Sequence, residues 1–220
     1  MVISSLDKKK ILLISALPQK SPYLKDVSEE IWQIEFIFGG QRSSKDNEFE
    51  TKNWPNIDET KLFELLKFDP DIIHFAGHGD KDGILLEDGT ENGKSISAEE
   101  LNLILSGQNK KFELIFLNSC FSENQAKELE KHSDHIIAIK GEIEQGIARV
   151  FAENFYKEYK DTKDVVKSYK NTMLKDKINY RRIRKLQKLY PEDKFIDQTL
   201  EDAVSKLSPF EKTIEYFSFS

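Results

Sequence analysis

Two histidines and the single cysteine of the chain stand at the ends of apolar runs. His74 and His78 fall in the stretch DIIHFAGHGDKDG (71–83), and Cys120 follows the apolar residues of FELIFLNSCF (112–121). Both runs have the length and composition of buried β-strands. His78 and Cys120 therefore take comparable places, because each stands where a strand gives way to a loop.

A thiol and an imidazole that meet at such a place can perform nucleophilic catalysis. A free cysteine is mostly protonated at neutral pH, so a nearby base or a helix N-terminus increases its reactive thiolate fraction. We expect His78 to accept the proton of the Cys120 thiol and later to give it to a leaving amine. Gly79 has no side chain to obstruct its backbone N–H, which together with the N–H of Cys120 is expected to form an oxyanion hole.

Other interpretations of these residues stay open. A lone cysteine in an apolar strand is often a small buried hydrophobe, and His74, inside its strand, has the place of a structural histidine. A zinc site made of His74, His78 and Cys120 would lack the paired spacing of structural zinc sites. The stretch AGHGDKDG also lacks the Gly-Lys-Ser/Thr ending of a phosphate-binding loop. We expect no metal and no cofactor.

The rest of the sequence supplies elements that can position these residues. Apolar runs alternate with helical stripes, which is the pattern of βα units around a mainly parallel sheet. Strands are expected over 10–17, 49–54, from 71, and over 112–121 and 135–141; helices are expected over 24–38, 57–68, 98–105, after 122 and over 147–159. The residues between the histidine and cysteine strands contain a small hairpin and a helix, so they form a crossover that can set these strands side by side. Sites in open α/β sheets lie at the carboxyl edge, where both strands would end.

Two helix starts have the pattern of a capping box. Ser97 is followed by Glu100, and Ser122 is followed by Gln125. In this motif the serine hydroxyl accepts a hydrogen bond from a free N–H of the first helical turn. The helix after Ser122 would then direct the positive end of its dipole at Cys120.

Composition limits the class of protein. The chain has 220 residues and a formal net charge of -6, with 39 acidic and 33 basic residues spread along its length, so nucleic acid is not expected as a direct partner. No apolar run approaches the length of a membrane span, and the run near the N-terminus is too short for a secretory signal. A single cysteine fits a reducing compartment. We expect a cytoplasmic protein without contact to a membrane.

The stretches DIIHFAGHGD, LIFLNSCFS and HIIAIKGEIEQGIARVFAENFYKEY, in this order, resemble a CHAT domain. This family is the caspase-like module of the cysteine peptidase clan that includes caspases and separases. The resemblance covers residues 9–175 and implies a three-layer α/β sandwich with a mainly parallel central sheet flanked by helices. It also implies that His78 and Cys120 form the catalytic dyad and that Gly79 and Cys120 form the oxyanion hole.

The resemblance also indicates residues of the substrate pocket. In caspases the residue two before the cysteine lines the first specificity pocket, and Asn118 holds that place. Caspases have glutamine and alanine before the cysteine, so a preference for aspartate is not implied. Glu142 and Glu144 stand where many CHAT domains have a tryptophan and an aspartate, and acidic residues there would favour a basic residue before the cut. Asn118, which is neutral, would instead fit a polar or medium apolar residue.

The predicted function is a cytosolic CHAT-type cysteine endopeptidase that cleaves a protein substrate in a bacterial defence or cell-death pathway. Residues 1–9 are too few for a folded pro-domain, so control is expected from a regulatory protein partner. The alternative is a non-catalytic caspase-like interaction or adaptor module. A flavodoxin-like signalling domain would need acidic residues clustered at strand ends, and the sequence has none.

The expected division of the chain is a CHAT domain over 1–175 and a helical extension over 176–220. The extension contains a basic run with Arg181, Arg182 and Arg184 and an apolar side with Ile178, Ile183, Leu186 and Leu189. Such a helix either packs on the domain or docks an acidic partner.

Overall fold

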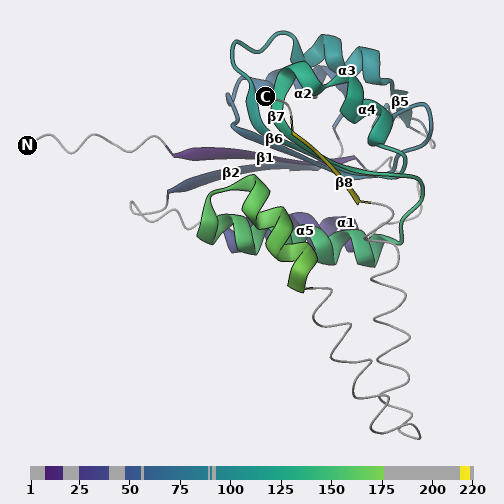
Figure 1. Ribbon diagram of the computed structural model, residues 1–220. Coiled ribbons are helices and arrows are strands. Elements are labelled where there is room, and N and C mark those ends of the chain that lie inside the picture. The colour runs from purple at the N-terminus through teal and green to yellow at the C-terminus, as the bar shows by residue number, and fades with distance from the viewer. Residues whose placement is uncertain are drawn as a thin grey trace, which may run out of the picture.

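A six-stranded sheet forms the middle layer of the molecule, with helices on both faces (Figure 1). The computed structural model describes residues 8–16, 25–39, 48–55, 57–88, 90, 93–175 and 214–218. Within these residues the arrangement confirms the three-layer α/β sandwich expected from the sequence.

The strand order is β2-β1-β3-β6-β7-β8, and neighbouring strands run parallel except for β8, which is antiparallel to β7. The strands are β1 (Lys9–Ala16), β2 (Phe49–Pro55), β3 (Ile72–Gly77), β6 (Phe112–Asn118), β7 (Ser133–Ile139) and β8 (Ile214–Ser218). Strands β3 and β6 are neighbours, with Ala76 opposite Asn118 at their carboxyl ends. The crossover predicted between the histidine strand and the cysteine strand is therefore confirmed.

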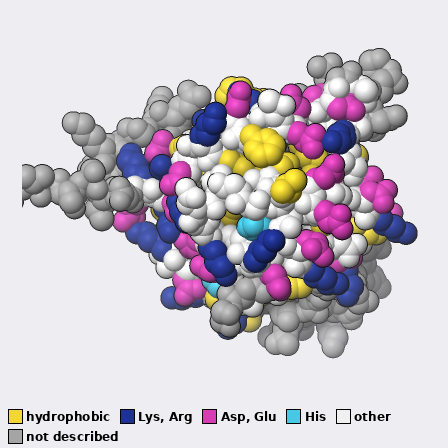
Figure 2. Space-filling view, turned by 90° about the horizontal axis from the view of Figure 1, so that it is seen from above, with side chains coloured by type: hydrophobic (Ala, Val, Ile, Leu, Met, Phe, Trp, Pro, Cys, Tyr) yellow, Lys and Arg dark blue, Asp and Glu magenta, His cyan; other side chains and the backbone are white. Residues whose placement is uncertain are grey.

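One face of the sheet is covered by α1 (Lys25–Ile37) and α5 (Gln145–Thr162), together with helical residues 165–175 (Figure 1). The other face is covered by the remaining elements, which are α2 (Glu59–Leu66), the hairpin of β4 (Ile84–Leu86) and β5 (Lys94–Ile96), α3 (Ala98–Leu105), α4 (Glu123–Glu128) and the 3₁₀ turn η1 (Glu130–His132). Seen from this second side, acidic and basic side chains are interspersed (Figure 2).

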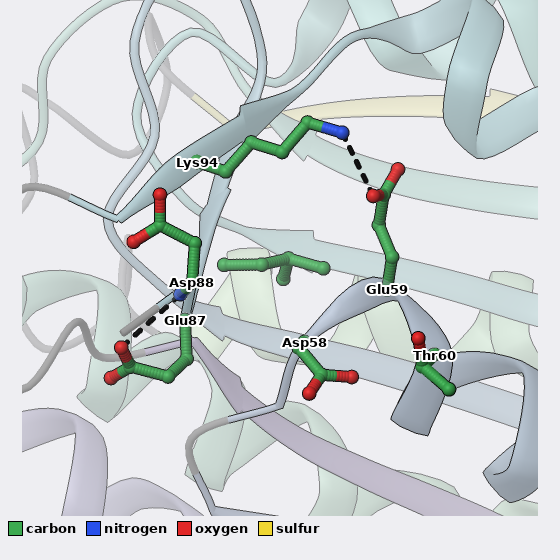
Figure 3. Close-up of a pocket in the computed structure, with 7 residues that line it drawn as sticks. Asp58, Glu59, Thr60, Glu87, Asp88 and Lys94 are labelled. Atoms are coloured by element: carbon green, nitrogen blue, oxygen red, sulfur yellow. Dashed lines mark hydrogen bonds and ion pairs between the residues drawn. The ribbon is translucent and has the colours of Figure 1, made fainter. Parts of the chain in front are cut away.

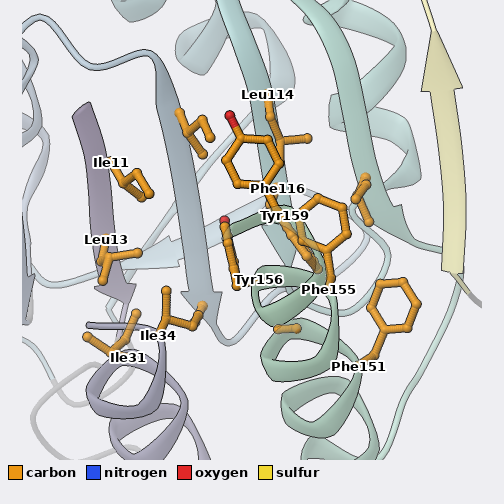
Figure 4. Close-up of a cluster of buried hydrophobic side chains, with 14 of the residues drawn as sticks. Ile11, Leu13, Ile31, Ile34, Leu114, Phe116, Phe151, Phe155, Tyr156 and Tyr159 are labelled. Atoms are coloured by element: carbon orange, nitrogen blue, oxygen red, sulfur yellow. The ribbon is translucent and has the colours of Figure 1, made fainter. Parts of the chain in front are cut away.

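Both faces of the central strands are apolar because each face meets a helical layer. In β1, Ile11 and Leu13 point to α1 and α5, whereas Leu12 and Ile14 point to the opposite layer. On the α1 and α5 side the core is rich in aromatic rings, which pack between β6 and α5 (Figure 4). Phe116 at its centre is fully buried and makes edge and stacking contacts with three rings of α5. Each such ring contributes on the order of 2 kcal/mol by burial, so this core fixes α5 against the sheet.

The capping box at Ser97 and Glu100 is confirmed, with both reciprocal hydrogen bonds formed. The capping box at Ser122 is wrong. Ser122 has helical backbone angles, and its side chain makes no cap hydrogen bond to α4. Its hydroxyl instead donates to Leu117 O at 2.9 Å and accepts from Ile139 N at 2.9 Å. The hydroxyl is engaged by the ends of two strands, so it is not available to the helix.

Strand β8 lies in the stretch for which only helix was expected. It adds an antiparallel edge strand to β7, and Tyr216 Oη lies 2.9 Å from His135 Nδ1 and stacks on that ring. The predicted basic helix with its three arginines lies outside the described residues. In the described part of the chain, no helix combines the length and apolar character needed to span a membrane.

Candidate active site

The carboxyl ends of β3 and β6 border a small cavity of about 60 Å³. His78 follows β3 directly, Cys120 follows β6 after one residue, and both line this cavity. Asn118, the last residue of β6, lines it as well. The structure thus brings together three of the side chains that the sequence indicated. The remaining wall comes from residues near the N-terminal ends of α1 and α5, among them Val27 and Ala148.

Gly79 packs directly on the cysteine turn. A Cβ atom at Gly79 would lie 2.6 Å from Cys120 O and 3.0 Å from Ser119 Cβ, so no side chain fits without a backbone shift. Gly79 and Ile84 form an isolated antiparallel β-bridge. Its two hydrogen bonds are made by the neighbouring residues: Asp80 N–H donates to Gly83 O, and Leu85 N–H donates to His78 O. The Gly79 N–H is not consumed by this bridge, as an oxyanion donor requires.

The thiol of Cys120 is half-buried and stands at a sharp turn of the chain. Its Sγ lies 3.9 Å from Ile143 O, on the segment that leads into α5. The next residue, Phe121, has a φ of 60°, a left-handed conformation that is strained for a residue with a side chain. The turn is held by the hydrogen bond from Phe121 N–H to Gly141 O at 2.8 Å and by the buried hydroxyl of Ser122. These hydrogen bonds therefore fix the backbone conformation of the turn that contains Cys120.

A buried carboxylate lies behind the cavity. Glu30 of α1 is only 2% exposed, and its Oε1 lies 2.8 Å from His74 Nε2 and accepts a hydrogen bond from Asn118 Nδ2 at 2.7 Å. The place of His74 agrees with its interpretation as a structural histidine, since it is fully buried and packs edge-on against Phe116. Through Glu30, the buried histidine is linked to the amide that stands two residues before Cys120.

Tyr156 of α5 completes the buried surroundings of this network. Its ring lies 5.5 Å from the His74 ring, centroid to centroid. Burial, followed by the negative charge of Glu30, raises the pKa of the Tyr156 hydroxyl far above its ordinary value. The Tyr156 hydroxyl therefore stays protonated at neutral pH.

The role of Glu30 was not predicted from the sequence, although the helical pattern of α1 places this carboxylate on the buried side of the helix. The apolar stripe of α1 contains Val27, Ile31 and Ile34, and Glu30 falls on the same side of the helix at the position three after Val27. A carboxylate on the buried side of an amphipathic helix needs a partner. The buried His74 was such a partner, but the contact joins residues far apart in the sequence.

Glu142 and Glu144 lie on the segment that leads into α5. Both are exposed, and neither lines the cavity, whereas Ile143 and Gln145 from the same segment do. His74 also does not line the cavity. Among the described residues no group of three histidine, cysteine or acidic side chains is arranged to hold a metal ion.

A larger cavity of about 250 Å³ lies between the start of α2 and the β4–β5 hairpin (Figure 3). Its lining is mostly charged, and Lys94 donates to Glu59 at 2.8 Å across it. Asp58 accepts a hydrogen bond from Lys61 N–H as the N-cap of α2. These charges are engaged by helix capping and ion pairing, and the lining contains no thiol or imidazole. The smaller cavity at Cys120 is therefore the better candidate for an active site.

Two proteins with protease names are similar to this chain. Over 159 residues the chain is 23% identical to a protein of Gillisia limnaea named "Probable protease", and the match covers 70% of this chain and 28% of that protein. Over 166 residues it is 28% identical to a "Roc-COR-CHAT protease" of an unknown prokaryotic organism, with 71% of this chain and 15% of that protein covered. The chain thus spans less than a third of the length of either relative.

The family comparison covers most of the sequence. Residues 3–183 match the CHAT domain, a range that contains β1 through α5 and every residue of the cavity described above. The three-layer architecture and the mainly parallel sheet are consistent with the caspase-like fold of that family. This chain belongs to the CHAT domain family of caspase-like, protease-related proteins.

Proposed function

We propose that this chain is a cysteine endopeptidase in which Cys120 is the nucleophile and His78 is the general base and acid. The observation that carries the proposal is the cavity that both side chains line, at the carboxyl ends of neighbouring parallel strands. Gly79, which has no room for a side chain, packs beside them. The protease names of two relatives support the same reaction class.

The reaction would proceed in two stages. His78 takes the proton of the Cys120 thiol, and the sulfur attacks the carbonyl carbon of a peptide bond, so that an S–C bond forms and the carbonyl electron pair moves to oxygen. The N–H groups of Gly79 and Cys120 receive this oxyanion. When it collapses, the C–N bond breaks and His78 gives its proton to the leaving amine. Water then cleaves the thioester, which releases a carboxylic acid and restores the thiol.

Asn118 is proposed to line the pocket for the substrate residue that precedes the cut. Its side chain lines the cavity next to Cys120, and its amide is fixed by the hydrogen bond to Glu30. Glu142 and Glu144 are exposed on the segment that contributes Ile143 to the cavity wall, so we assign them to its outer rim.

The biological setting is also a proposal. A protein substrate in a bacterial defence or cell-death pathway, a cytoplasmic location and control by a protein partner would suit a peptidase of this family. A relative whose name joins Roc, COR and CHAT supports an arrangement in which other modules act on the peptidase. The basic stretch with Arg181, Arg182 and Arg184 is a candidate docking segment for such a partner.

Alkylation kinetics test the dyad without knowledge of the substrate. The rate of Cys120 modification by iodoacetamide, followed by intact-mass spectrometry, is measured for the folded protein and for the same chain in urea. We expect the folded protein to react faster, and His78→Ala to lower its rate by tenfold or more, because the thiol loses its base. His132→Ala is the matched control, since His132 bonds Asn102 on the other side of the sheet and does not line the cavity.

A cleavage assay completes the test. Wild-type protein and Cys120→Ala are incubated with a peptide library, and new termini are identified by mass spectrometry. Cleavage that persists in Cys120→Ala, or a folded thiol that reacts no faster than the thiol of the unfolded chain, would refute the peptidase. In that case the chain would be a non-catalytic interaction module.

A further inference from the structure

We propose that the cavity beside Cys120 accepts a lysine or arginine side chain of the substrate, and that the buried Glu30 sets this preference. The inference rests on the proposed function, because it names the residue that precedes the cut. It assigns the negative charge of the pocket to α1, not to Glu142 and Glu144, which are exposed outside the cavity.

The first argument is the arrangement of the Glu30 carboxylate. Both of its hydrogen-bond contacts, with His74 Nε2 and Asn118 Nδ2, end on Oε1. Within the described part of the chain no group donates a hydrogen bond to Oε2, and Glu30 lines the cavity. One carboxylate oxygen is therefore left for a donor that enters the cavity.

The second argument concerns the partners of Glu30. His74 Nδ1 is buried and has no hydrogen-bond partner among the described residues, so the contact of its ring with Glu30 is the single one between Nε2 and Oε1. A buried carboxylate needs further hydrogen bonds or a cation, and a cationic ligand supplies both.

The third argument is the orientation of the Asn118 amide. Because its Nδ2 donates to Glu30, its Oδ1 is an acceptor, and that oxygen is buried without a hydrogen-bond partner. Asn118 itself is 94% buried, since only 6% of it is exposed. Glu30 and Asn118 thus line the same cavity, and each has one oxygen without a hydrogen-bond donor among the described residues. This pattern is complementary to an ammonium or guanidinium group, which has donors only.

The rest of the lining fits the same ligand. None of the described lining residues is lysine or arginine. The nearest basic residue of α5, Arg149, is paired with Glu29 and Glu153. Val27, Ile143 and Ala148 form apolar parts of the wall, against which the methylene groups of a long basic side chain can pack. A cavity of about 60 Å³ has the volume of about two water molecules, which suits a terminal charged group.

The test uses covalent peptide probes that react with Cys120. Peptidyl acyloxymethyl ketones are made with one common sequence and a single variable residue next to the warhead. That residue is lysine, its uncharged analogue norleucine, arginine, its uncharged analogue citrulline, or glutamate. The second-order rate of Cys120 modification is measured for each probe by intact-mass spectrometry. The pairs keep length and shape while they change charge.

We expect the lysine and arginine probes to react on the order of 10- to 100-fold faster than norleucine and citrulline, as a hydrogen bond to a charged group predicts. Glu30→Gln should remove most of this difference between the charged and the uncharged probes. Glu29→Gln is the matched control: it removes the same charge from the neighbouring position of α1, where the side chain is 40% exposed. That variant should keep the preference.

Each contrary result has a separate meaning. Equal rates for the lysine and norleucine probes, with iodoacetamide reactivity still above that of the unfolded chain, overturn the cation pocket and leave the peptidase proposal standing. A preference that survives in folded Glu30→Gln overturns the role of Glu30. If Glu30→Gln does not fold, the rates of the probe pairs with wild-type protein still show whether a basic residue is preferred. Glu30→Asp keeps the charge but moves the carboxylate, so a change of the preference in this variant shows that the carboxylate of residue 30 sets it. A folded Cys120 that reacts with no probe overturns both proposals.

Discussion

Removal of the Ser122 hydroxyl should destabilise the fold far more than a serine-to-alanine change normally does. This hydroxyl is fully buried, donates to Leu117 O and accepts from Ile139 N, each at 2.9 Å. In Ser122→Ala, one carbonyl at the end of β6 and one N–H at the end of β7 lose their partner. A buried unsatisfied group costs about 1–3 kcal/mol, so with partial relaxation we expect a loss of about 2–4 kcal/mol in the free energy of unfolding.

The assay is urea unfolding followed by circular dichroism, with the free energy taken from the midpoint and slope. Ser106→Ala is the matched control. Its hydroxyl also donates to a backbone carbonyl, Leu103 O, at 2.6 Å, but it is exposed and water can replace it. We expect that control to lose less than about 0.5 kcal/mol. A loss below about 0.5 kcal/mol in Ser122→Ala, or a loss equal to that of the control, would refute the reasoning.

Two further predictions concern Gly79 and Asp71. Gly79→Ala should slow alkylation of Cys120 and abolish cleavage while the protein stays folded, because the new methyl group would press on Cys120 O; unchanged alkylation and cleavage would contradict the packing. Burial raises the pKa of Asp71, but the hydrogen bonds from Lys10 N–H and the Lys110 ammonium outweigh it and hold the pKa below its usual value. A lowered folded pKa adds stability above about pH 4, and this stability is lost as the pH falls further. The stability difference between wild type and Asp71→Asn should therefore shrink below about pH 4 in urea titrations, and a difference independent of pH would contradict it.

The sequence predicted the sheet and its helices because their signals are local. The apolar stripe of α1 and the apolar run of β6 each lie within one element, and the observed bounds fall close to those expected. That His78 and Cys120 line one cavity was also predictable, because a crossover of this kind places two parallel strands side by side with their carboxyl ends at one edge.

Features that depend on contacts between distant segments were not predictable in this way. Ser122 and Ser97 have the same local pattern, yet Ser97 caps its helix and Ser122 bonds two strand ends. The difference arises because Ser122 stands at the end of β6, within reach of β7, and both strand ends need a buried partner. Strand β8 pairs with β7 although it comes much later in the chain, so its pairing depends on a free sheet edge that no local pattern reveals.

The two histidines four residues apart take different places along one strand. His74 lies inside β3, on the face that meets α5, whereas His78 directly follows the last residue of β3. His74, in the interior, bonds Glu30; Glu30 fixes the amide of Asn118; and Asn118 stands beside the cavity that His78 and Cys120 line. The buried histidine is therefore linked to the pocket through Glu30, and the histidine at the strand end lines the same cavity as the thiol. His74 thus belongs, with Glu30 and Asn118, to the part of the site that is proposed to select the substrate. His78, four residues later, belongs with Cys120 to the part that is proposed to cleave it.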